Sequence, residues 1–311
     1  MAWLVAGGLC CFVTGAAQPE ELTAARVGSR IDVMVGGDFF TSYRFSPDEK
    51  YPFFFPVNGP SGASVTSMRN GQYPHHSSLF FGCDKVNGGN YWQDNLASGQ
   101  ILSTGPVIEQ AAGPEVVITD TCLWKRPGAE PPLRDTRRIT ISAPDATLRQ
   151  IDFEITLEAL SDVTIEKTNH SLFSVRMDPD LTPAFGGTMI NAAGRSGETA
   201  TFGQPSEWMA CFGPRGAGPT EGIAIFQHPG NRGAPAPWFT RDYGFMSPTP
   251  MYWPADDSAT RIARGETWRL RYRVLVFTGE PSRLDLAERF SEYATAATLE
   301  TGTDPNRITA D

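Results

Sequence analysis

Short apolar runs of strand length recur along most of the chain, and residues that favour turns separate them. The runs are rich in the β-branched and aromatic residues that fit a pleated, half-buried surface. Asn58-Gly59-Pro60, Asn87-Gly88-Gly89 and Arg195-Ser196-Gly197 are examples of the intervening turn signals. This pattern predicts strands over Arg30–Val35, Phe39–Phe45, Phe53–Val57, Ser78–Gly82, Val116–Trp124, Arg137–Ser142, Ile151–Leu160, Val163–Lys167, Phe173–Met177, Trp208–Phe212, Gly222–His228 and Thr267–Thr278.

A convincing helical pattern occurs only near the end of the chain, from Pro281 to about Thr298, with Ser282 as its expected cap. Apolar residues spaced three to four apart line one face of this segment: Leu284, Ala287, Phe290 and Tyr293. Many strands without interspersed helices indicate sheet packed on sheet. We therefore expect an all-β fold, a large two-sheet antiparallel sandwich with one C-terminal helix.

The first 17 residues have the features of a signal peptide, although they lack a basic start. An apolar run from Ala2 to Val13 leads into small residues before Gln18-Pro19. We expect residues 1–17 to be a signal peptide, residues 18–311 to form a single β-sandwich domain, and the protein to be secreted or periplasmic. No later run approaches the roughly 20 apolar residues of a membrane-spanning helix, so we expect no membrane partner.

Charge and cysteine content narrow the classes of function. The net charge is −9 and no Lys/Arg-rich run is present, which argues against a nucleic-acid partner. Three cysteines follow the predicted signal peptide: Cys83, Cys122 and Cys211. Because their number is odd and they have no CxxC spacing, we expect them to be small buried residues and not part of a zinc knuckle. Nucleotide-binding glycine loops, HExxH and GxSxG are all absent from the sequence.

All four histidines lie beside turn residues at the ends of predicted strands, where sandwich folds present binding groups. Histidine exchanges protons near neutral pH, which suits acid–base catalysis. Neighbouring residues of an extended chain point to opposite faces, so we expect at most one of His75 and His76 to serve a given site. The candidate catalytic residues are His76, His170 and His228, with Asp84 or Asp242 as the carboxylate; a structural role is the alternative for each.

Two segments carry residues suited to binding sugars. Asp84–Trp92 combines a carboxylate, amides and aromatic rings around glycines, and its alternative interpretation is a hairpin turn with Trp92 in the core. Asn231–Trp253 is rich in aromatic residues and arginine where no regular element is predicted, and an Arg241–Asp242 structural pair is the alternative there. The candidate substrate contacts are His75, Asn87, Trp92, Asn231, Trp238, Arg241 and Tyr243.

Two long motifs resemble a bacterial family of unknown function labelled "methane oxygenase PmoA-like". They are Phe54-Phe55-Pro56-Val57 through Pro74-His75-His76-Ser77-Ser78 to Trp92, and Gln227-His228-Pro229-Gly230-Asn231 to Tyr243-Gly244. The resemblance covers residues 30 to 280. Many members carry His where this chain has Cys83 and Phe239, so the chain resembles a divergent subgroup. This departure weakens any metal hypothesis that needs those two positions. The oxygenase label implies an integral membrane protein, and the sequence has no spanning segment to match it.

Two shorter motifs are similar to motifs in galactose mutarotase-like proteins. They are Thr168-Asn169-His170-Ser171-Leu172-Phe173, and Arg264-Gly265-Glu266-Thr267-Trp268 before the last long strand. This resemblance implies a two-sheet supersandwich that binds sugar, with His170 as a general acid and His75 or His76 as a substrate contact.

These observations favour a carbohydrate-active enzyme that applies acid–base chemistry to a glycoside as a hydrolase or lyase. The alternatives are a sugar mutarotase or epimerase, and a non-catalytic glycan-binding module. A third interpretation places a metal between His75 or His76, His228 and Asp84. We expect no cofactor, and a carbohydrate or another small polar molecule as the substrate.

Overall fold

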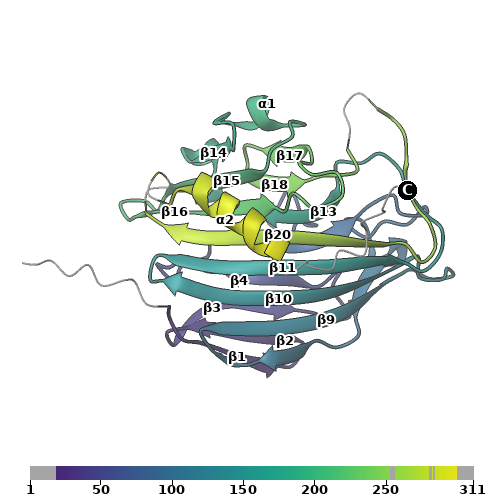
Figure 1. Ribbon diagram of the computed structural model, residues 1–311, viewed down its shortest axis with the longest axis horizontal. Coiled ribbons are helices and arrows are strands. Elements are labelled where there is room, and N and C mark those ends of the chain that lie inside the picture. The colour runs from purple at the N-terminus through teal and green to yellow at the C-terminus, as the bar shows by residue number, and fades with distance from the viewer. Residues whose placement is uncertain (1–18, 253–255, 280–281, 283, 300–311) are drawn as a thin grey trace, which may run out of the picture.

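The computed structural model describes residues 19–252, 256–279, 282 and 284–299, and it consists mainly of two large antiparallel sheets packed face to face (Figure 1). The predicted all-β class, the two-sheet sandwich and the C-terminal helix are confirmed. The predicted signal peptide lies outside the described residues.

The first sheet has nine strands among the described residues. In spatial order they are β17 (Trp238–Arg241), β18 (Phe245–Pro248), β13 (Ser171–Arg176), β5 (Leu79–Cys83), β4 (Phe53–Val57), β3 (Asp38–Arg44), β2 (Arg30–Val35), β1 (Leu22–Val27) and β8 (Ala112–Gly113). Strands far apart in sequence meet here, because β13 pairs with both β5 and β18.

The second sheet contains the longest strands of the described chain. In spatial order it has β14 (Thr188–Asn191), β15 (Trp208–Pro214), β16 (Thr220–Gln227), β20 (Thr267–Thr278), β11 (Leu148–Ala159), β10 (Leu133–Asp145), β9 (Glu115–Lys125) and β6 (Gln100–Ser103), and β7 (Val107–Gln110) also pairs with β9. The short strands β12 (Val163–Ile165) and β19 (Thr260–Ile262) form a separate pair.

Strict alternation of burial along β10 and β11 shows why these segments become strands. Successive side chains point to opposite faces, so one set enters the core and the other faces outward. The main core cluster between the sheets is rich in aromatic residues, including the fully buried Trp92, Trp124 and Trp238. Cys83, Cys122 and Cys211 are buried free cysteines, as expected.

The C-terminal helix α2 (Leu286–Leu299) packs on the outer face of the second sheet (Figure 1). It begins five residues later than predicted, and the Asp285 carboxylate caps it by accepting from Glu288 N at 3.0 Å. Ser282 is therefore not the cap. Leu286 is buried, and the expected Ala287 is exposed.

The expectation that Asn231–Trp253 lacks regular structure is wrong. Strands β17 and β18 form a hairpin in this segment, with Trp238 opposite Pro248 and Arg241 opposite Phe245. Gly244 completes the turn at φ +87°, a conformation that glycine adopts without steric cost. The hairpin extends the first sheet beyond β13.

Further helical turns are short. They are α1 (Glu198–Thr201) and the 3-10 turns Leu96–Ser98, Pro179–Leu181 and Pro183–Phe185. Within the described residues, the helices are too short or too polar to cross a membrane.

Candidate functional site

Three of the four histidines gather around the Trp92 ring. His75 and His76 precede β5, and their ring centroids lie 4.5 Å apart at nearly right angles. Both rings also contact Trp92, at 5.5 and 5.6 Å. The expectation that they point to opposite faces is wrong because the segment is a turn, in which His76 N donates to Tyr73 O, and not an extended strand.

His170 completes this group and is paired with a carboxylate. Its Nδ1 lies 3.1 Å from Asp84 Oδ2, and its ring stacks on Trp92 at 4.5 Å. The backbone fixes the pair as well, since Asp84 N donates to His170 O. The Asp84 side chain is 5% exposed and the His170 side chain 27%, so only the imidazole is presented to solvent. We refer to His75, His76, His170, Asp84 and Trp92 as the imidazole cluster.

The pairing sets the chemistry of the His170 ring. A carboxylate at Nδ1 favours the tautomer that carries its proton on that nitrogen, which leaves the Nε2 lone pair for another partner. The Gln93 amide lies 3.4 Å from the same Nδ1, but a contact to an ionised oxygen is the stronger of the two. The contact therefore orients the His170 ring, as in other Asp–His pairs.

The pKa values of the other two histidines of the cluster are lowered. His76 is 2% exposed, and burial, with His75, Arg176 and His170 adding to it, lowers its pKa to about 2. Burial and then His170 also lower the pKa of His75. Both rings are thus neutral at neutral pH.

An aromatic wall adjoins the cluster. Tyr73 stacks on Tyr243 at 4.3 Å and on His76 at 5.0 Å, and the Arg176 guanidinium lies 4.4 Å from the Tyr243 ring centre. Burial raises the pKa of the Tyr243 hydroxyl. Tyr243 sits in the turn of the β17–β18 hairpin, which is how a residue distant in sequence reaches His76. Sequence reasoning did not single out Tyr73 and Arg176.

His228 does not join the cluster. It follows β16 in the second sheet, where its Nδ1 accepts from Arg271 Nη2 and from Gly230 N, both at 2.9 Å. Its ring also contacts Tyr293 of α2 at 5.4 Å. Burial, reinforced by Arg271, lowers the pKa of His228 to about 4. The expected convergence of His228 with the other histidines fails because its strand belongs to the other sheet.

Arg241 and Asp242 are both engaged by Glu198 at the start of α1. Arg241 Nη1 lies 2.7 Å from Glu198 Oε1, while Asp242 Oδ1 accepts from Glu198 N at 2.8 Å. Asp242 N in turn donates to Glu198 Oε2. Arg241 and Asp242 therefore do have the structural role given as the alternative to substrate binding. Each is paired with Glu198, however, and not with the other.

The other predicted contacts hold backbone segments in place. Trp238 is fully buried and its Nε1 donates to Ser206 O. Asn231 Oδ1 accepts from Arg271 N and its Nδ2 donates to Arg271 O. Asn87 similarly binds the backbone beside β12, through Thr164 N and Asp162 O.

Among the described residues, no three or more His, Cys, Asp or Glu side chains are arranged to hold a metal ion. The set of His75 or His76, Asp84 and His228 is not assembled, because His228 lies on the second sheet.

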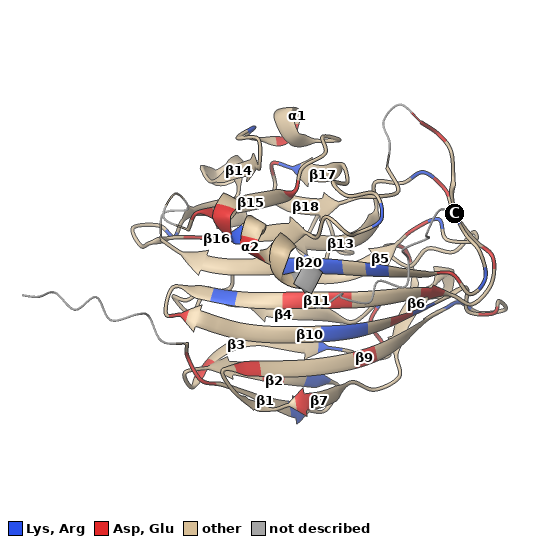
Figure 2. Ribbon diagram, in the orientation of Figure 1, with Lys and Arg blue, Asp and Glu red and all other residues tan. Residues whose placement is uncertain are grey.

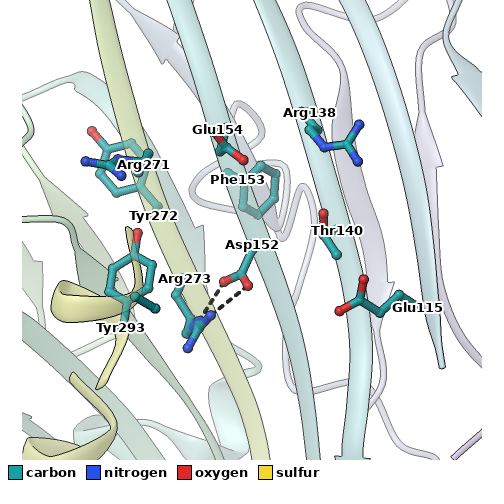
Figure 3. A pocket seen from close by; sticks show the side chains of 11 residues that line it. Glu115, Arg138, Thr140, Asp152, Phe153, Glu154, Arg271, Tyr272, Arg273 and Tyr293 are labelled. Atoms are coloured by element: carbon teal, nitrogen blue, oxygen red, sulfur yellow. Dashed lines mark hydrogen bonds and ion pairs between the residues drawn. The ribbon is translucent and has the colours of Figure 1, made fainter. Parts of the chain in front are cut away.

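A separate hollow of about 360 Å³ lies on the outer face of the second sheet, bordered by α2 (Figure 3). We refer to it as the charged hollow. The residues that line it are Glu115, Arg138, Thr140, Asp152, Phe153, Glu154, Arg271, Tyr272, Arg273, Tyr293 and Ala296. None of the predicted site residues is among them.

Comparison with known proteins places the chain in a family. Residues 30–291 match the model of the family of unknown function DUF6807, so the chain belongs to that family. No curated protein matches it.

Solved structures similar to the chain are distant. They include the YidC insertase (13% identity, TM-score 0.38, 93% of this chain and 48% of that one), a polysaccharide lyase (12%, 0.36, 88% and 34%) and a kojibiose phosphorylase from the human microbiome (8%, 0.37, 82% and 32%). The chain spans less than half the length of each.

Proposed function

We propose that this protein is a carbohydrate-active enzyme of the secreted or periplasmic space, and that His170, oriented by Asp84, transfers a proton to or from the sugar. The observation that carries the proposal is the Nδ1–Oδ2 contact of 3.1 Å, combined with the partial exposure of the ring. A positioned imidazole accelerates proton transfer by roughly 10²- to 10⁴-fold. The reaction needs no cofactor.

The surroundings of His170 support a sugar as the substrate. Half-buried Tyr73 and Tyr243 lie beside the imidazoles, and aromatic rings at a site pack on the apolar side of a sugar ring. The similarity of Thr168–Phe173 to the galactose mutarotase-like motif also favours a sugar and gives the same histidine a role as acid. We also propose that the fold is related to the two-sheet supersandwich of the galactose mutarotase-like proteins. An oxygenase reaction has no support here.

The chemistry of the cluster favours proton abstraction over classical hydrolysis. Hydrolysis by two carboxylates needs one on each side of the glycosidic bond. Asp84 is the carboxylate of this cluster, and it is buried against His170. We therefore propose elimination at a glycoside as the first reaction to test. The His170 imidazole takes the proton next to the carboxylate of a uronic acid, a carbon–carbon double bond forms as the bond to the glycosidic oxygen breaks, and that oxygen leaves with a proton from solvent. Ring opening with epimerisation or mutarotation is the second reaction to test.

The test is turnover of a panel of polysaccharides and oligosaccharides by the wild type and by His170→Ala, Asp84→Asn and His228→Ala. Elimination creates a carbon–carbon double bond that absorbs in the ultraviolet, hydrolysis creates reducing ends without it, and epimerisation changes the sugar's NMR spectrum without cleavage. We expect His170→Ala to lose at least about 100-fold in kcat. His228→Ala is the matched control and keeps its activity.

A glycan-binding module is the second candidate, and the stacked Tyr73–Tyr243 pair favours it. Binding of a sugar by both the wild type and His170→Ala, without turnover of any member of the panel, would replace the enzyme proposal by this one. Activity that survives in His170→Ala would refute the assigned role of His170.

A further inference from the structure

The outer face of the second sheet carries an ordered ladder of opposite charges. Arg138 lies opposite Glu154 across β10 and β11, and Glu154 lies opposite Arg271 across β11 and β20. The next row in the ladder is Thr140, Asp152 and Arg273. Figure 2 shows the resulting alternation of blue and red across these strands, and Figure 3 shows both rows facing the charged hollow.

The two rows differ in how tightly their charged side chains are paired. Asp152 accepts from Arg273 Nε and Nη2 at 2.7 and 2.9 Å, and the guanidinium lies 4.7 Å from the Tyr293 ring centre, so this row is fixed against α2. Glu154 is 39% exposed, and its nearest ion pair, to Arg269, is long at 3.6 Å. Arg138 is 48% exposed, and its Nη1 donates to Glu109 Oε2 of β7, which is also exposed. The row of Arg138 and Glu154 is therefore held only by exposed ion pairs, which a ligand can displace.

A second feature of the hollow is a polar atom without a partner. Tyr293 is 6% exposed, and its buried hydroxyl makes no hydrogen bond within the described residues. In Figure 3 its oxygen is directed toward Arg271. A buried hydroxyl that stays unpaired costs free energy, and a ligand hydroxyl removes that cost once the Tyr293 side chain turns toward the hollow.

The charges identify the class of ligand. Three arginines face three carboxylates around the hollow, so the lining has no net charge and favours neither anions nor cations. Guanidinium groups donate pairs of hydrogen bonds and carboxylates accept pairs, which matches the neighbouring hydroxyls of a sugar. The volume of about 360 Å³ lies within the range of roughly 300–1,000 Å³ typical of small-molecule sites.

We propose that the charged hollow is a second binding site, which holds a unit of a neutral saccharide between β10, β11, β20 and α2. It shares the ligand class of the proposed function, but it rests on different residues on the other sheet, so either proposal can fail alone.

The experiment is isothermal titration calorimetry of the full-length protein with neutral hexaoses: cellohexaose, xylohexaose, mannohexaose and maltohexaose. We expect the wild type to bind at least one, and the Arg138→Ala/Glu154→Ala double variant to bind it at least about tenfold more weakly, because charged hydrogen bonds are lost. Tyr293→Phe, which removes one oxygen from the wall, also weakens binding.

The matched control is Arg134→Ala/Glu158→Ala. This pair lies across the same two strands and on the same face, but it does not line the hollow. We expect it to bind as the wild type does. The proposal is overturned if the wild type binds none of the hexaoses, if the two double variants lose affinity equally, or if His170→Ala abolishes binding. Tighter binding of an acidic galacturonate hexamer, lost in the Arg138/Glu154 variant, would also overturn it in favour of an anionic ligand.

Discussion

The buried carboxylate of Asp135 gives the sharpest stability prediction. It is fully buried on β10 and accepts from Arg137 Nε at 2.6 Å and from Trp124 Nε1 at 2.7 Å. Burial alone would lower the pKa of Arg137, but Asp135 more than offsets this and raises it. Asp135→Ala would leave a charged guanidinium, 3% exposed, and an indole N–H without this partner.

Breaking a buried pair from one side costs about 3–5 kcal/mol, against a total stability of roughly 5–15 kcal/mol for a domain. We therefore expect Asp135→Ala to lose about 3–5 kcal/mol in urea unfolding followed by tryptophan fluorescence, whereas Arg134→Ala, which breaks an exposed pair on the same strand, loses at most about 1 kcal/mol. Equal losses in the two variants would refute the reasoning.

Two further predictions concern pH and backbone geometry. The pKa values of His76 and His228 fall to about 2 and about 4 from 6.5, so below pH 6.5 the unfolded chain binds protons that the folded chain excludes. The free energy of unfolding should therefore decrease from pH 6.5 to 5, and less steeply in His228→Gln; parallel profiles by urea titration would contradict this. Gly244→Ala should destabilise the protein by more than about 1 kcal/mol, because the added Cβ would lie 2.3 Å from Thr182 Cγ2 at φ +87°. Gly216→Ala, at φ +55° with open space around it, is the control, and equal shifts in Tm would argue against the steric account.

The fold could be predicted because its information is local. The burial alternation of β10 and β11 follows from the sequence of these segments, and the turn between them follows Pro144-Asp145. The β17–β18 hairpin was missed because both faces of these short strands are buried, so their residues show no period of two.

The candidate site could be predicted only in part, because its geometry depends on pairing between distant strands. His170 meets Asp84 through the β13–β5 pairing, and the adjoining resemblance motifs helped to single out both. His228 also lies beside turn residues at the end of a predicted strand, as His170 does, but its strand joins the other sheet. The charged hollow had no local signal, since Arg138, Glu154 and Arg271 resemble ordinary outward-facing residues until three strands align them.

The buried cysteines have a consequence for the compartment in which the protein works. Burial raises the pKa of Cys211 to about 12 and those of Cys83 and Cys122 well above the usual value. Oxidants attack the thiolate, which is scarcely populated at such pKa values. Three unpaired thiols would therefore persist in an oxidising medium, and the fold needs no reducing environment to keep them unmodified.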